Sequence, residues 1–212
     1  MIDICPTITA ADARTYRVQM EQVVGFATRI HIDVSDGEFT PNKLLDFEYI
    51  WWPGGLRADI HVMYRRPMEH TEILLGLKPQ LVIVHAEAEG DFTDFAEALH
   101  KNGIEVGVAL LPPTPPETIE SSLEFIDHVL IFSGHIGYFG GHADVGLLEK
   151  VKKLKLLKPQ LEIGWDGGVN DQNAAAMVRA GVEVLNAGGF IHGAKDPQAA
   201  YARLQAVTEG VV

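Results

Sequence analysis

Histidine and aspartate side chains recur in three short segments whose neighbouring residues are apolar. In HIDVSDGEF, His31 and Asp33 share one face of an extended strand, while the isoleucine and valine beside them share the other. DIHVM carries His61, and GWDGG carries Asp166. Ionisable groups among apolar neighbours need a partner, a metal or a chemical task, because an uncompensated buried charge is costly. Two imidazoles and two carboxylates form a mixed nitrogen and oxygen ligand set for one divalent transition-metal ion.

Simpler interpretations exist for the individual residues. His61 alone is typical of a hydrogen-bonded core histidine, and Asp36 in the DG dipeptide is a turn former. His85 and Glu87 could form a local hydrogen-bonded pair. Asp33 is harder to explain in this way, because an inward-facing carboxylate pays a large desolvation cost. The four candidate ligands together therefore favour a metal site.

The elements that would position these residues alternate along the chain. Apolar, β-branched runs predict strands at 2–7, 29–34, 58–63, 81–86, 104–111, 128–133, 161–165 and 182–188. Helical spacing, capping residues or a following proline or glycine predict helices at 91–103, 145–159 and 170–181.

Repetition of a strand followed by a helix or loop predicts an α/β fold with a parallel sheet. Eight such units favour a (β/α)8 TIM barrel that takes up residues 1–212 as a single domain. The units near 44–53 and 112–125 have the weakest helical pattern, and a doubly wound open sheet is the structural alternative. In a barrel the candidate ligands follow the carboxyl ends of strands, where active sites of this architecture lie.

Three glycine clusters follow the last three predicted strands, at 137–141, 166–170 and 187–193. Each alone is typical of a tight turn. On adjacent strands of a barrel they also suit a phosphate group, since glycine lets backbone N–H groups approach an anion.

Composition excludes several classes of protein. The 212 residues are 47% hydrophobic and 22% charged, with a formal net charge of −12, which argues against nucleic acid as a partner. No run is long and apolar enough for a membrane span, and the N-terminus has no basic region typical of a signal peptide. Cys5 is the single cysteine, which excludes an intrachain disulfide and fits a cytoplasmic location.

These motifs together resemble the ribulose-phosphate 3-epimerase family. HIDVSDGEFTPN, DIHVM and WDGGVN are similar to its second-, third- and seventh-strand motifs, and ICPTITAAD, VALLPPTP and AGGFIHGAKDP follow in the family's order. The resemblance implies one bound divalent ion, either Zn, Fe(II), Mn or Co. It implies His31, Asp33, His61 and Asp166 as the metal ligands, with Asp33 and Asp166 as the catalytic acid and base.

The reaction that the resemblance implies is inversion at C3 of D-ribulose 5-phosphate to D-xylulose 5-phosphate. It would pass through an enediolate stabilised by the metal, with proton transfer by a different group on each face. Substrate binding would fall to Thr7, His61, Met63, Gly137, Phe139, Gly140, Gly141, Gly167, Gly168, Gly188 and Gly189.

Departures from the family pattern leave the substrate open. Ser35 and Phe132 stand where the family has methionines, Leu111 replaces an asparagine, and Gly189 replaces a serine. The sixth-strand loop is one residue longer than usual. The alternatives are 3-epimerisation of a hexulose 6-phosphate such as allulose 6-phosphate, a non-catalytic phosphosugar-binding barrel, and a metal-assisted aldolase. Since the family often forms dimers or larger rings, we expect a homo-oligomer.

Overall fold

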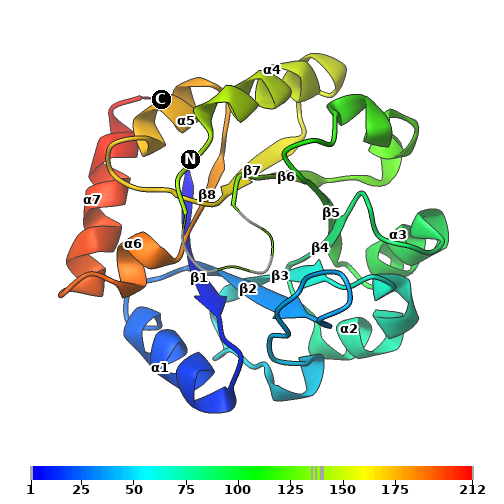
Figure 1. The fold of residues 1–212 in the computed structure, drawn as a ribbon, viewed down its shortest axis with the longest axis horizontal. Coiled ribbons are helices and arrows are strands. Elements are labelled where there is room, and N and C mark those ends of the chain that lie inside the picture. Colours follow the sequence, from blue (N-terminus) through cyan, green and yellow to red (C-terminus); the bar gives the residue numbers. More distant parts are fainter. Residues whose placement is uncertain (1, 135, 137, 139–140, 212) are drawn as a thin grey trace.

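A ring of parallel strands encloses the centre of the molecule, and helices surround it (Figure 1). The computed structural model describes residues 2–134, 136, 138 and 141–211. Strands β1 to β8 pair in sequence order, and β8 returns to β1, which closes the barrel. The predicted (β/α)8 architecture is confirmed, and the doubly wound alternative is wrong. The strands are β1 (Asp3–Thr9), β2 (Arg29–Ser35), β3 (Arg57–Met63), β4 (Leu81–His85), β5 (Glu105–Leu110), β6 (His128–Phe132), β7 (Glu162–Asp166) and β8 (Val184–Ala187).

The connections after the strands are less regular than the strands themselves. The α-helices are α1 (Ala13–Val23), α2 (Thr71–Leu77), α3 (Phe92–Lys101), α4 (Leu148–Leu157), α5 (Ala174–Arg179), α6 (Gly189–His192) and α7 (Pro197–Glu209). The 3-10 helices are η1 (Phe47–Tyr49), η2 (Pro67–His70), η3 (Pro116–Phe125) and η4 (Val145–Leu147). The two weakest units are thus 3-10 segments, while the predicted helix at 145–159 begins as η4 and the one at 170–181 is shorter.

Alternation along the strands separates an apolar outer face from an inner face. Ile32, Val34 and Val62 are fully buried in the main core, between the barrel and its helices. The inner face of β2 carries His31 and Asp33, and the register pairs Asp33 with His61 on β3. Because all strands are parallel, the side chains near their carboxyl ends meet at one mouth of the barrel.

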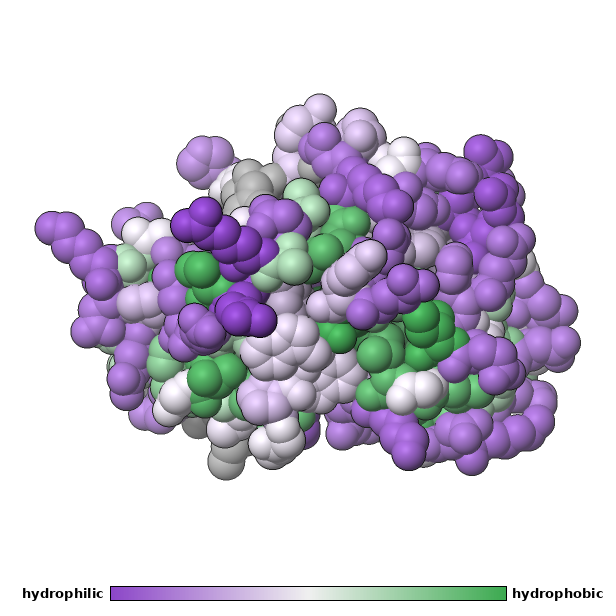
Figure 2. Space-filling model, turned by 90° about the horizontal axis from the view of Figure 1, so that it is seen from below, coloured by the Kyte–Doolittle hydropathy of each residue, from purple (hydrophilic) through white to green (hydrophobic). Residues whose placement is uncertain are grey.

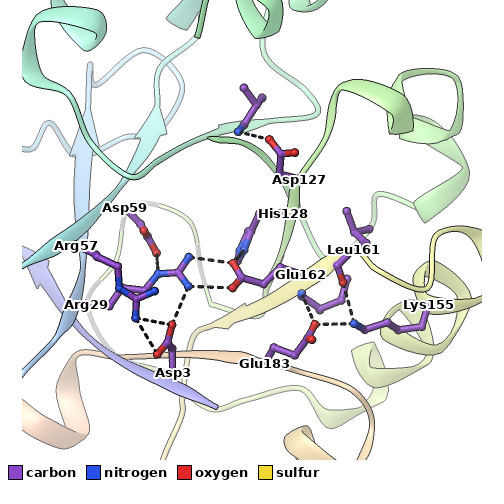
Figure 3. Close-up of polar contacts among 12 residues, drawn as sticks. Asp3, Arg29, Arg57, Asp59, Asp127, His128, Lys155, Leu161, Glu162 and Glu183 are labelled. Atoms are coloured by element: carbon purple, nitrogen blue, oxygen red, sulfur yellow. Dashed lines mark hydrogen bonds and ion pairs between the residues drawn. The ribbon is translucent and has the colours of Figure 1, made fainter. Parts of the chain in front are cut away.

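The opposite end of the barrel is closed by a buried ionic network (Figure 3). Arg29 donates from Nε to Asp59 at 2.8 Å, and from its terminal nitrogens to Asp3 and Glu162 at 3.0 Å. Glu162 is also 2.7 Å from His128 Nδ1. Arg29 and Asp59 are almost fully buried, so the network is part of the barrel interior. It joins β1, β2, β3, β6 and β7 at their amino ends.

Candidate functional site

Two histidines and two aspartates from β2, β3 and β7 converge at the carboxyl end of the barrel. One ligand atom from each of His31, Asp33, His61 and Asp166 lies within 4.8 Å of the others. Asp33 Oδ1 is 2.9 Å from His61 Nδ1 and 3.3 Å from His31 Nε2. The structure thus brings together the four residues that the sequence singles out as ligands.

The residues present fit a divalent transition ion. Ligands about 2.1 Å from one ion lie at most about 4.2 Å apart, so a small side-chain shift closes the set. Both ring nitrogens of His31 are buried without a hydrogen-bond partner among the described residues, as expected of an imidazole that needs a ligand. The two carboxylates supply negative charge that a cation would balance.

The two aspartates have opposite electrostatic environments. Burial raises the pKa of Asp166 to about 6, and the negative charge of Asp33 adds to this effect. Burial also disfavours ionised Asp33, but the close contacts of its carboxylate with His31 and His61 outweigh it and hold the pKa of Asp33 well below its usual range. A pair of carboxyl groups whose pKa values are pushed apart is the arrangement expected of an acid and a base.

Asp33 is held by contacts on both of its carboxylate oxygens. Thr9 Oγ1 donates to Asp33 Oδ2 at 2.6 Å, and His61 Nδ1 contacts Oδ1. Thr9 thus belongs to the candidate site, although the sequence pattern did not single it out. The signal was available, because Thr9 follows Thr7 by two residues on the first strand and therefore faces inward with it.

His85 reaches the same cluster from β4. Its Nε2 is 2.8 Å from Nε2 of His61, and its ring lies 4.8 Å from Phe39 and 6.0 Å from Phe132 between centroids. Nδ1 of His85 is 3.6 Å from Glu87, beyond hydrogen-bond range. The expected local contact between His85 and Glu87 is thus present, but longer than a hydrogen bond. His85 also contacts a candidate metal ligand.

A cavity of about 350 Å³ opens above the cluster, within the range of small-molecule sites. Asp33 and Asp166 reach it, whereas His31 and His61 lie deeper. The other predicted site residues that line it are Thr7, Met63, Gly141, Gly167, Gly168, Gly188 and Gly189. Gly137, Phe139 and Gly140 lie outside the described residues.

The glycines after β7 allow two loops to approach closely. Gly167 and Gly168 have φ values of +105° and +72°, which favour glycine. A Cβ on Gly167 would lie 2.4 Å from the backbone nitrogen of Gly134, and one on Gly168 would lie 2.2 Å from that of Ala143. These glycines therefore let the β6 and β7 loops form one wall of the cavity.

Asn186 on β8 is a second residue that our sequence analysis missed. It lines the cavity, and both polar atoms of its side chain are buried without a partner among the described residues. Thr7 Oγ1 is likewise buried without a hydrogen-bond partner among the described residues. An amide and a hydroxyl left unpaired beside a cavity are suited to a hydroxylated ligand. VEVLNAG displays this asparagine at a strand end, which is the signal that could have revealed it.

The sequence departures differ in their effect on the site. Phe132 lines the cavity and lies 5.9 Å from the ring of His61. Ser35 is buried, and its Oγ is 3.0 Å from Thr40 Oγ1. This hydrogen bond stabilises the loop that follows β2. The carbonyl of Leu111 accepts from Lys150 Nζ at 2.7 Å. Of these, Phe132 alters the cavity wall directly.

Comparison with known proteins identifies relatives along nearly the whole chain. The model of the ribulose-phosphate 3 epimerase family matches residues 3–192. The ribulose-phosphate 3-epimerase of Helicobacter pylori is 32% identical, covering 98% of this chain and 99% of that protein. The Bacillus subtilis enzyme of that name is 30% identical, with coverage of 97% and 99%. The solved 3-hexulose-6-phosphate synthase of Salmonella typhimurium shares the fold, with a TM-score of 0.73, 14% identity and full coverage of both chains.

None of the helices in the described part of the chain combines the length and apolarity that a bilayer crossing requires.

Proposed function

This chain belongs to the ribulose-phosphate 3 epimerase family, and we propose that it interconverts D-ribulose 5-phosphate and D-xylulose 5-phosphate. It is an isomerase of the epimerase class that acts on carbohydrate phosphates. The observation that carries the proposed reaction is the position of Asp33 and Asp166. Both carboxyl groups reach one cavity, from strands separated in the barrel by β1 and β8.

Inversion at C3 needs a group on each side of the planar intermediate that can take or give a proton. We assign removal of the C3 proton in one direction to Asp33, whose carboxylate is kept ionised by its histidine and threonine partners. Asp166, whose pKa is raised, returns a proton to the opposite side. In the reverse direction the two exchange roles.

His31, Asp33, His61 and Asp166 would hold one divalent ion. When bound, this ion supplies positive charge beside the ketone oxygen, where negative charge develops as the C3 proton leaves. Zn, Fe(II), Mn and Co all suit this ligand set, because mixed histidine and aspartate sites accept several ions of this series.

We assign the substrate phosphate to the glycine-rich side of the cavity. Gly167, Gly168, Gly188 and Gly189 line it there, on the loops after β7 and β8. Backbone N–H groups without flanking side chains suit an anion. Asn186 and Thr7 then face the hydroxylated carbons, while Phe132 and Met63 add apolar surface to the cavity.

Hydrogen exchange tests the reaction most directly. Metal-loaded protein incubated with D-ribulose 5-phosphate in deuterated water is expected to place deuterium at C3 of both epimers. Asp33→Asn and Asp166→Asn should each lower turnover by at least about 100-fold, since acid and base groups of this kind contribute 10²–10⁴-fold. Full turnover by either variant would refute the two-base assignment. Absence of exchange with any pentulose or hexulose phosphate would exclude the epimerase.

A hexulose 6-phosphate is the second candidate substrate, because Phe132 changes the cavity wall at a position that faces the sugar. Comparison of kcat/KM for ribulose 5-phosphate and allulose 6-phosphate separates the two. A higher kcat/KM for the hexulose would show that a hexulose 6-phosphate is the preferred substrate. The assignment of proton transfer to Asp33 and Asp166 would not change.

We also propose that residues 1–212 form one domain, that the protein acts in the cytoplasm, and that it forms a homo-oligomer. The surface supports the last point. Hydrophobic patches interrupt the hydrophilic residues on the face in Figure 2. Tyr49 and Trp51, in the β2–β3 connection, are 55% and 43% exposed. Sedimentation analysis gives the oligomeric state, and a monomer at all concentrations would contradict this proposal.

A further inference from the structure

His85 is a buried titratable residue to which the proposed reaction assigns no task. It lies at the end of β4, and its Nε2 is 2.8 Å from Nε2 of His61. The other ring nitrogen of His61, Nδ1, is 2.9 Å from Asp33. His61 therefore has one nitrogen directed to the candidate metal cluster and the other directed to His85.

The hydrogen bond between His61 and His85 can run in either direction. Its direction depends on which ring nitrogen of His61 carries the proton. When Nδ1 of His61 carries its proton, it donates to Asp33, and Nε2 accepts from His85. A metal ligand must present a lone pair, so use of Nδ1 as the ligand moves the proton of neutral His61 to Nε2. Nε2 then needs an acceptor, and among the described residues Nε2 of His85 is the atom placed to accept.

The surroundings of His85 fix its ring in this position. Phe39 lies on one side of it at 4.8 Å, and Phe132 packs edge-on at 6.0 Å. Its Nδ1 faces Glu87, whose carboxylate accepts from Thr114 Oγ1. If Nε2 of His85 accepts, its proton stands on Nδ1, towards the carboxylate of Glu87. The acceptor direction is thus compatible with everything that surrounds the ring.

We propose that His85 is a positioning residue, which selects the tautomer and the ring orientation in which His61 binds the metal. This inference rests on the proposed function, since it assumes that His61 is a ligand. His31 differs, because its Nδ1 has no hydrogen-bond partner among the described residues. The effect of His85 is therefore confined to one of the two imidazole ligands.

A matched pair of variants tests the proposal. Glutamine can place an amide oxygen near the position of Nε2, whereas asparagine is one carbon shorter and falls short of His61. His85→Asn is expected to weaken Zn²⁺ and Co²⁺ binding by about 10- to 100-fold, and His85→Gln to recover most of the loss. Phe39→Leu is the control, because leucine keeps an apolar side chain against His85 and leaves the imidazole in place. We expect its affinity to stay within about twofold of wild type.

The measurements are metal dissociation constants of the metal-free proteins, from competition with a chromogenic chelator, together with their melting temperatures. Excess Co²⁺ should restore the activity of His85→Asn, since the defect lies in affinity. Equal dissociation constants for wild type and His85→Asn overturn the inference, and so does a loss shared equally by His85→Gln and His85→Asn. A wild-type chain that binds neither ion overturns the proposed metal site itself, and this inference with it.

Discussion

Arg29 is the residue whose removal should most damage the barrel without touching the active site. Its side chain is 2% exposed and is the cation that faces Asp59, which is 1% exposed. In Arg29→Met the aliphatic part of the side chain is kept, but the carboxylate of Asp59 loses its partner (Figure 3). Breaking a buried pair from one side costs about 3–5 kcal/mol, because the remaining charge is uncompensated.

This loss converts into a measurable melting shift. Unfolding entropy of about 2.1 cal/mol/K per residue gives roughly 0.45 kcal/mol/K for a chain of this size, so Arg29→Met should melt about 7–11 °C lower. Arg57→Met is the control, since the side chain of Arg57 is 46% exposed and its guanidinium is bonded to Asp3. A surface pair of this kind is worth about 0–1 kcal/mol, or at most about 2 °C.

The sign of the pH dependence follows from Asp59. Burial raises the pKa of Asp59 in spite of Arg29, and loss of Arg29 raises it further. A carboxyl group with a raised pKa destabilises the fold while it is ionised and stops doing so once it is protonated. The deficit of Arg29→Met should therefore be full above the raised pKa of Asp59 and shrink as the pH falls through it towards about 4. Calorimetry at several pH values tests this. A shift no larger than that of Arg57→Met, or one that grows with acid, would refute the reasoning.

Two further substitutions test residues that line the cavity. Gly168→Ala forces a side chain into a φ of +72°, 2.2 Å from the nitrogen of Ala143, and should cost roughly 1–3 kcal/mol or more and raise KM for the phosphorylated substrate. Unchanged melting and KM would contradict this role. Asn186→Val removes an unpaired buried amide, so melting should rise while KM rises by about tenfold, the equivalent of one hydrogen bond. A KM equal to wild type would show that the amide does not bind substrate.

Much of the barrel could be predicted because its strands obey a simple rule. Parallel strands buried on both faces read as short β-branched runs, and each predicted run is matched by a strand with similar bounds. The convergence of His31, Asp33, His61 and Asp166 followed from the same rule, since every parallel strand ends at the same mouth. Distance along the chain was irrelevant once the fold was known.

The rest depends on packing that a linear pattern does not contain. The segments η1 and η3 have too little helical periodicity to be placed, and tertiary contacts decide their form. The contact between His61 and His85 depends on the rotation of two rings, so the sequence offered Glu87 as an equally reasonable partner. Arg29 begins a strand and resembles a solvated charge until the register shows that it faces inward.

The position of the ionic network gives it a second consequence, which stability alone does not measure. Arg29 lies two residues before His31 on β2, Asp59 two before His61 on β3, and Glu162 precedes Asp166 on β7. The strands that carry the candidate metal ligands are therefore tied together at their other ends. Two residues of strand span about 6–7 Å, so a slip at one end displaces the ligands at the other.

A double variant separates the two consequences. Replacing both buried charges, as in Arg29→Met with Asp59→Leu, removes the unpaired charge and should restore melting to within about 2 °C of wild type. Leucine and methionine fill the same space, but they make no directional contact that would fix the register between neighbouring strands. We therefore expect Zn²⁺ to bind about tenfold less tightly to the stable double variant. Wild-type affinity in that protein would show that the network stabilises the barrel without aligning its ligands.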